Sequence, residues 1–113
     1  MTNQKLYIIT RQDLLPGLQA AQITHAAVDF IFKYPEQAQQ WRNNSNYVVA
    51  LSVANEAELT KLAINLVKTD IDYCLFKEPD LNEELTAIAV LPKVSMFGHL
   101  PLALRSEQNA SYN

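Results

Sequence analysis

The sequence predicts an α/β protein, a three-layer α/β/α sandwich with a mixed four-stranded sheet whose last strand is antiparallel. Apolar, β-branched runs alternate with segments of helical periodicity, which is the pattern of parallel strands joined by helices. The length of 113 residues and the hydrophobic fraction of 49% suit one domain with its own core. The stretch from Glu78 to Glu84 is too short for a helical crossover, so the fourth strand should return antiparallel to the third.

The first half of the chain should hold one strand and two helices. Residues 5–10 are expected to form a strand, because their centre is continuously apolar, as in a strand covered on both faces. Residues 18–33 show helical spacing, and Tyr34-Pro35 should end that helix. Residues 36–42 form a short second helix. The regularly spaced side chains of the first helix are Leu18, Ala21, His25, Val28 and Phe32.

The second half should hold three strands and one helix. The strands are expected over residues 47–53, 72–76 and 85–91. Asn55 is a candidate N-cap for the intervening helix, since Glu58 follows three residues later. The buried stripe of that helix should be Leu59, Leu62, Ala63 and Leu66. Residues 1–104 then form one domain that closes with a packed segment, 94–104, and residues 105–113 form a polar tail.

Composition excludes several classes of protein. The net charge is −3 and the basic residues are scattered, which argues against a general nucleic-acid binder and restricts any RNA contact to a local surface. The single cysteine, Cys74, suits a buried thiol in a reducing, cytoplasmic setting. No signal peptide or membrane span is expected. No cofactor motif occurs, and His25 and His99 lack the neighbouring ligands of a metal site.

Polar residues from distant segments should meet at the carboxyl edge of the sheet, where open α/β sheets bind ligands. Arg11 and Asp13 follow the first strand, and Lys77, Glu78 and Asp80 follow the third. Each also has an ordinary structural interpretation, namely a surface ion pair, a capping aspartate or a solvated acidic loop.

Three further features belong to the same region. Thr86 opens the fourth strand at this edge, and either a catalytic or a satisfied strand hydroxyl fits its position. The start of the first helix presents free N–H groups that favour an anion. His25 lies about 10 Å along that helix, which leaves open a core or interface histidine or a site residue.

The chain resembles the peptidyl-tRNA hydrolase 2 family in four segments. Arg11-Gln12-Asp13-Leu14 is similar to the R-x-D-L that follows the family's first strand. The segment from Ala20 to Ala27, AAQITHAA, is similar to the family's A-A-Q-x-x-H-A-A helix. Thr86–Val90 and Gly98–Leu102 are similar to its T-A-L-A-I strand and its closing G-H-L-K-L-L. The family's G-K-G-K turn is replaced by Leu15-Pro16-Gly17-Leu18, and its R-D-A-G by Lys77-Glu78-Pro79-Asp80.

The resemblance implies cleavage of the ester between a peptidyl or acyl group and tRNA. Glu78, or Asp80, would orient or deprotonate water, and Thr86 with helix N–H groups would stabilise the oxyanion. Arg11 would contact phosphate or the acyl group. The other substrate-binding candidates are Asp13, Gln22, His25 and Lys77.

The alternative is a non-catalytic binding or assembly module of the same fold. An exposed apolar surface around Tyr34, Trp41 and Phe97 would support it, as would a homodimer.

Overall fold

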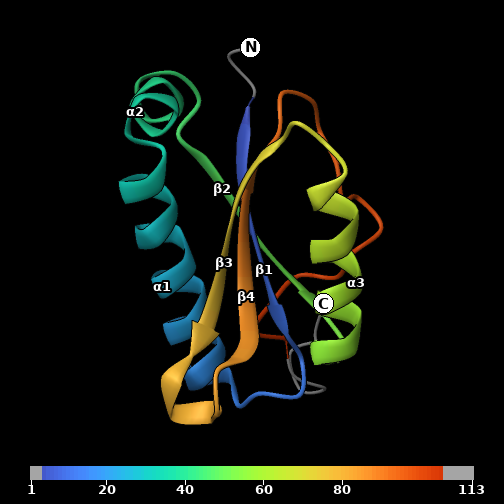
Figure 1. Cartoon of the computed structure of the whole chain (residues 1–113). Helices are drawn as coiled ribbons and strands as arrows, with labels where there is room; N and C mark the ends of the chain where they lie inside the picture. The colour runs from blue at the N-terminus through green and yellow to red at the C-terminus, as the bar shows by residue number, and fades with distance from the viewer. Residues whose placement is uncertain (1–3, 106–113) are drawn as a thin grey trace.

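The structure is a computed structural model that describes residues 4–105, and its strands and helices alternate as the sequence predicts (Figure 1). The last two strands are connected by five residues, 79–83. The first three of them, Pro79–Leu81, form a 3-10 turn. The elements in chain order are β1 (Lys5–Arg11), α1 (Pro16–Lys33), α2 (Pro35–Asn43), β2 (Tyr47–Val53), α3 (Glu56–Val67), β3 (Asp72–Glu78) and β4 (Glu84–Leu91).

The four strands form one mixed sheet in the order β2-β1-β4-β3. Strands β1 and β2 are parallel, and β4 is antiparallel to both of its neighbours, which confirms the predicted direction of the last strand. Because β3 opposes β4, it runs the same way as β1 and β2. The carboxyl ends of β1, β2 and β3 therefore share one edge with the start of β4, and we call this the carboxyl edge.

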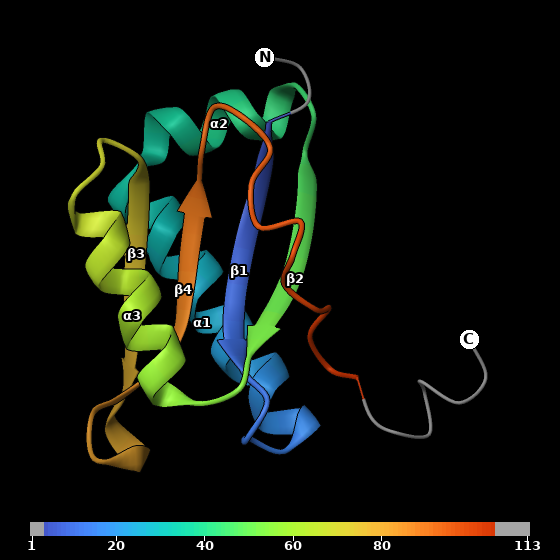
Figure 2. The ribbon, with the colours of Figure 1, turned by 90° about the vertical axis from the view of Figure 1, so that its right-hand side faces the viewer.

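The helices cover both faces of the sheet, as expected for three layers (Figures 1 and 2). Helices α1 and α2 lie on one face, and α3 lies on the other with the chain that follows β4. Alternate residues of the central strands fill the two cores. The core under α1 includes Leu6, Ile8, Phe30, Ala87 and Ala89. The core under α3 includes Tyr7, Ile9, Leu59, Ile88 and Val90.

Helix α3 forms as predicted, whereas α1 buries a different stripe. The Asn55 side chain caps α3 by accepting a hydrogen bond from the Glu58 N–H at 3.0 Å. The helix α1 is present where the spacing predicts it, but the regularly spaced side chains are not its buried face, since Val28 and Phe32 are 44% and 80% exposed. His25 is also exposed, so it is not a core histidine. The residues that α1 buries are Gln19, Gln22, Ala26 and Phe30.

The segment after β4 packs against the outer edge of β2. The Ser52 N–H donates to the Pro101 carbonyl and the Ala103 N–H to the Ala50 carbonyl, both at 2.9 Å. These bonds cover part of an edge strand that would otherwise present unpaired backbone groups.

The apolar surface expected around Trp41 and Phe97 is wrong, because both rings are buried in the two cores. The Trp41 indole N–H donates to the Tyr47 carbonyl at 2.8 Å, which allows the ring to be buried. None of the described helices is long and apolar enough to span a membrane. The predicted polar tail lies outside the described residues from position 106 onward.

Candidate active site

Buried polar side chains gather at the carboxyl edge. Among the described residues they come from the ends of β1, β2 and β3, the first turns of α1 and the start of β4. Burying a polar group costs free energy unless it is hydrogen-bonded, and each buried side-chain polar atom in the described part of the chain has a partner. The set is Thr10, Arg11, Gln19, Gln22, Ser52, Glu78 and Thr86.

A β-bulge in β4 turns Thr86 toward α1. Ile88 and Val90 face α3, so strict alternation would place Thr86 on that side as well. The register instead passes from Phe76 opposite Ala87 to Lys77 opposite Leu85, which leaves Thr86 as the extra residue. Bulges commonly redirect a side chain beside a functional site.

Side chains satisfy the backbone groups around this bulge. The Thr10 hydroxyl donates to the Thr86 carbonyl at 2.9 Å. The Leu85 N–H donates to the Glu56 carboxylate at 2.9 Å, and its carbonyl accepts from Arg11 at 3.2 Å. The bulge is therefore fixed in place by residues from β1 and α3.

Thr86, Gln22 and Glu78 form a chain of hydrogen bonds that leads from the core toward the surface. The Thr86 hydroxyl donates to the Gln22 Oε1 at 2.6 Å, and the Gln22 Nε2 donates to the Glu78 Oε1 at 2.9 Å. An ionised carboxylate only accepts, so Glu78 fixes the orientation of the Gln22 amide. Thr86 and Gln22 are fully buried, and Glu78 is 9% exposed. Glu78 is thus the outermost group of this hydrogen-bond chain.

Glu78 is held as a carboxylate. The hydrogen bond from Gln22, followed by the one from the Asp80 N–H at 3.1 Å and the nearby His25, keeps the pKa of Glu78 below its usual value. Hydrogen bonds donated to the charged form stabilise that form. Glu78 is the last residue of β3 and caps the following 3-10 turn, whereas the sequence placed it in a loop.

Arg11 is engaged by two carboxylates. Its Nε and one terminal nitrogen donate to the two oxygens of Asp13, each at 2.9 Å. Its other terminal nitrogen donates to Glu84 at 2.8 Å and to the Leu85 carbonyl. Asp13 and then Glu84 raise the pKa of Arg11, and Arg11 lowers that of Asp13. Arg11 is 6% exposed, and the two carboxylates that contact it neutralise its charge within the fold.

His25 of α1 is exposed and lies near the Glu78 carboxylate. Its ring stacks on Phe76 of β3, with the ring centroids 4.6 Å apart and the planes at 14°. Lys77 and Asp80 are exposed next to the same strand end. All eight residues that the sequence indicated lie at the carboxyl edge, but they do not form one cluster. Gln22, His25, Glu78 and Thr86 meet on the α1 side of the sheet, and Asp80 follows Glu78. Arg11 binds Asp13 as a separate pair. Lys77 alternates with Phe76 and Glu78 along β3, so it projects from the opposite face.

The sequence did not indicate Thr10, Glu56 and Glu84, which hold the bulge and Arg11. Their positions at strand and helix termini next to the site could have marked them as candidates. Their hydrogen-bond partners could not be predicted, because these partners depend on the bulge in β4.

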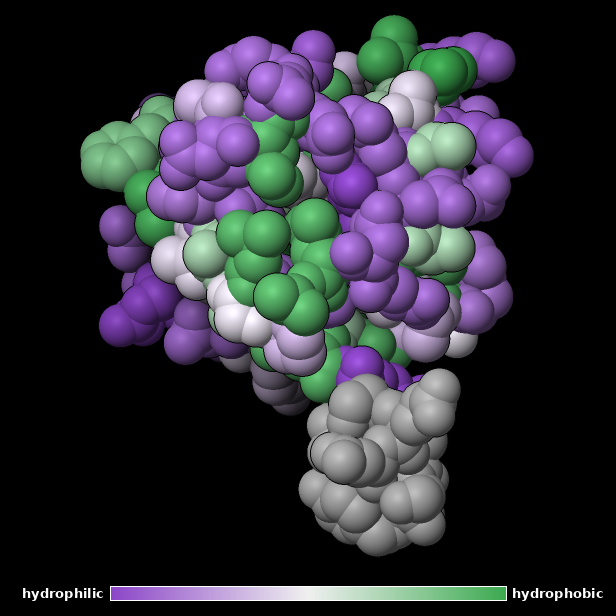
Figure 3. All heavy atoms as spheres, turned by 90° about the horizontal axis from the view of Figure 1, so that it is seen from below, coloured by the Kyte–Doolittle hydropathy of each residue, from purple (hydrophilic) through white to green (hydrophobic). Residues whose placement is uncertain are grey.

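The turn that leads into α1, Leu15-Pro16-Gly17-Leu18, is apolar and carries no lysine. Leu15, at the N-cap, is 78% exposed and makes no side-chain cap. Viewed from below, the carboxyl edge shows apolar atoms gathered in the middle of the face with polar atoms around them (Figure 3). The turn therefore lacks the cationic side chains that contact phosphates in nucleic-acid-binding proteins.

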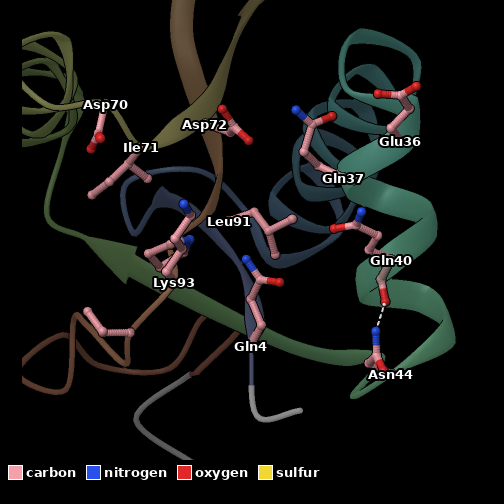
Figure 4. A pocket seen from close by; sticks show the side chains of 12 residues that line it. Gln4, Glu36, Gln37, Gln40, Asn44, Asp70, Ile71, Asp72, Leu91 and Lys93 are labelled. Carbon is pink, nitrogen blue, oxygen red and sulfur yellow. Dashed lines mark hydrogen bonds between the residues drawn. The ribbon is translucent and has the colours of Figure 1, made fainter. Parts of the chain in front are cut away.

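A separate hollow of about 880 Å³ lies at the opposite end of the sheet, between α2 and the start of β3 (Figure 4). Its polar side chains come mainly from carboxamides and carboxylates, with Lys93 on one side. None of these polar side chains is buried, in contrast to the carboxyl edge. Groups of histidine, cysteine and acidic residues arranged for a metal are absent from the described residues.

Fold and site together define a small three-layer α/β/α protein with a buried polar chain that ends in a carboxylate. The family model described as peptidyl-tRNA hydrolase PTH2 matches residues 4–97. The chain belongs to the PTH2 family of peptidyl-tRNA hydrolases, which confirms the resemblance from Arg11 through Val90. The closing Gly98–Leu102 segment lies outside the match. No curated protein matches the chain.

Proposed function

We propose that this protein hydrolyses the ester that joins a peptidyl or acyl group to the 3′ oxygen of tRNA. The observation that supports the proposal is the chain from Thr86 through Gln22 to Glu78, which presents an oriented carboxylate at the carboxyl edge. Membership of the PTH2 family supports a tRNA-linked ester as the class of substrate.

Glu78 is proposed to orient the attacking water. A carboxylate with a lowered pKa is a weak proton acceptor, but its charge stabilises the positive charge that develops on the water during attack. The water oxygen bonds to the ester carbon, the bond from that carbon to the ribose 3′ oxygen breaks, and the water proton passes to this leaving oxygen. Asp80, exposed beside Glu78, is the alternative residue for this role.

Thr86 is proposed as a positioning residue for Gln22 and Glu78. Its hydroxyl proton is donated to Gln22 and its side chain is fully buried, so an oxyanion would need other donors. The N–H groups of Gly17 and Leu18 at the uncapped start of α1 lie at the same edge and are suited to this role.

The defining experiment measures peptide release from a defined peptidyl-tRNA by the intact protein and three variants. We expect Glu78→Gln to lower kcat/KM by roughly 10²–10⁴-fold, the usual contribution of a positioned acid or base. Asp80→Asn tests the alternative residue. Glu36→Gln, an exposed carboxylate on α2, is the matched control and should retain full activity. Absence of turnover by the intact protein at high enzyme concentration would exclude the hydrolase.

One observation favours the second candidate, a non-catalytic binding module. Arg11 is paired with Asp13 and Glu84, so the cation expected to meet phosphate is already neutralised. Phosphate contacts supply much of the affinity of proteins for nucleic acid. A protein that binds a partner at this edge but releases no peptide would be the binding module. A homodimer and a cytoplasmic location also stay predictions.

A further inference from the structure

His25 is an exposed residue whose imidazole stacks on Phe76. The planes lie within 14° of parallel, so one face of the imidazole is covered by Phe76. His25 is nonetheless an exposed residue, and Phe76 beneath it is partly buried. Because Phe76 covers one face of the imidazole, the opposite face and the ring edge are the parts left to account for the exposure of His25, and the stack fixes the plane of the ring.

Phe76, on which the His25 ring stacks, lies one strand repeat from Glu78 in β3. Phe76 and Glu78 are two residues apart in β3 and project from the same side, which separates them by about 7 Å. On α1, His25 is one helical turn from Gln22, which binds Glu78. A flat group stacked on His25 would thus have its attached atoms beside the carboxylate.

The charges around the site disfavour a substrate held through phosphates. Arg11 is neutralised, the turn before α1 is apolar, and Asp80, Glu83 and Glu84 border the strand ends. Stacking of a base on an aromatic ring needs no charge and adds affinity for any base. An open ring is thus the feature of this edge best suited to hold a nucleotide.

We infer that His25 is a stacking platform for the terminal nucleobase of the nucleic-acid part of the substrate, which sets the ribose beside Glu78. The inference rests on the proposed function, because a nucleic-acid substrate comes from it. It adds the substrate group that His25 contacts and the kind of contact.

The test is binding of a trinucleotide, cytidine-cytidine-2-aminopurine, which corresponds to a tRNA 3′ end with a fluorescent terminal base. Stacking quenches 2-aminopurine, so one titration gives both the Kd and the environment of the base. His25→Leu is the main variant, because leucine still covers Phe76 but offers no aromatic face. His25→Phe restores a flat ring, and Phe32→Ala removes another exposed aromatic residue of α1 as the matched control.

We expect His25→Leu to raise the Kd roughly 5- to 150-fold and to abolish the quenching, the range for loss of one base–aromatic stack. His25→Phe should restore both, and Phe32→Ala should change neither. Equal Kd and quenching in His25→Leu and the intact protein would overturn the inference, as would equal binding of a trinucleotide without its terminal base.

The two proposals can fail separately. If binding depends on His25 but the intact protein releases no peptide, the stack is supported and the hydrolase is excluded. If peptide is released and His25→Leu leaves binding and quenching unchanged, the hydrolase stands and the stack is overturned.

Discussion

Replacement of Thr86 by valine tests the buried hydrogen-bond chain. Valine keeps the shape of threonine but removes the hydroxyl that donates to the Gln22 Oε1 at 2.6 Å. The Gln22 amide cannot turn to compensate, because its Nε2 donates to Glu78. The Gln22 carbonyl oxygen would then be buried without a donor, which costs about 1–3 kcal/mol.

We expect Thr86→Val to lower the free energy of unfolding by about 2 kcal/mol and Tm by roughly 8 °C for a chain of this length. Urea unfolding at pH 7, followed by circular dichroism, measures the change. Thr86→Ser should cost only about 1 kcal/mol through its lost methyl group, while the hydroxyl and any peptidyl-tRNA hydrolysis are retained. Thr86→Val should lose both the hydrogen bond and the alignment of Glu78.

Thr24→Val is the matched control, because the Thr24 hydroxyl donates only to the Ala20 carbonyl on the exposed side of α1. Its effect should stay within about 0.5 kcal/mol, as for most surface substitutions. If Thr86→Val were as stable as the intact protein, the Thr86 hydroxyl would not be the donor that holds Gln22, and the proposed positioning role would be refuted.

Four other predictions follow from single contacts. Asn55→Ala should lower the free energy of unfolding by about 1 kcal/mol in urea, because the α3 cap is lost. The pKa of Glu78 in the folded protein is below its usual 4.5, so the ionised carboxylate stabilises the fold above that pH and this contribution is lost on acidification. Glu78→Gln should therefore flatten the fall in the free energy of unfolding between about pH 5 and pH 3. Burial raises the pKa of the Cys74 thiol, so a thiol reagent should modify it slowly in the folded protein and rapidly in denaturant. Leu15→Lys should steepen the dependence of log Kd on log salt for tRNA by about 0.7–0.9, the value for one added phosphate contact.

Element order and strand direction could be predicted because both depend on local pattern and connection length. Residues Tyr47–Val53 form β2 as predicted, although Tyr47 and Val48 are exposed. The stripe from Leu59 to Leu66 is buried much as its periodicity indicates. The short link after Glu78 forces β4 to return beside β3. These features need no knowledge of distant contacts.

The buried face of α1 could not be predicted, because it depends on partners far away in the chain. Hydrophobicity favours Val28 and Phe32, yet the helix buries Gln19 and Gln22. Gln22 is buried because Thr86 and Glu78 satisfy its amide. Gln19 is buried because its side-chain N–H donates to the Leu14 carbonyl and its side-chain oxygen accepts from the Leu104 N–H. Side-chain hydrogen bonds across the fold therefore outweigh the local hydrophobic pattern at this end of α1.

The bulge at Thr86 explains why the candidate residues divide into two groups. Strict alternation leaves no reason for Thr86 to meet α1, so the sequence could place it at the correct edge but not assign its contacts. Once the bulge is present, Thr10 and Arg11 bind its carbonyl groups, and Thr86 binds Gln22. These buried residues build the site and are not free to touch substrate.

The remaining chemistry of the site therefore rests on the side chains that face outward. Glu78, at 9% exposure, is the least buried group of the hydrogen-bond chain, and His25 and Asp80 are exposed near it. Stability alone would favour apolar residues in place of a buried amide and threonine, because a satisfied polar pair adds little net free energy. The described chain nevertheless places its buried polar side chains at the carboxyl edge and keeps the rest of the core apolar. This arrangement holds one carboxylate near an exposed, stacked imidazole, which is the arrangement that the proposed ester hydrolysis beside a stacked nucleotide would use.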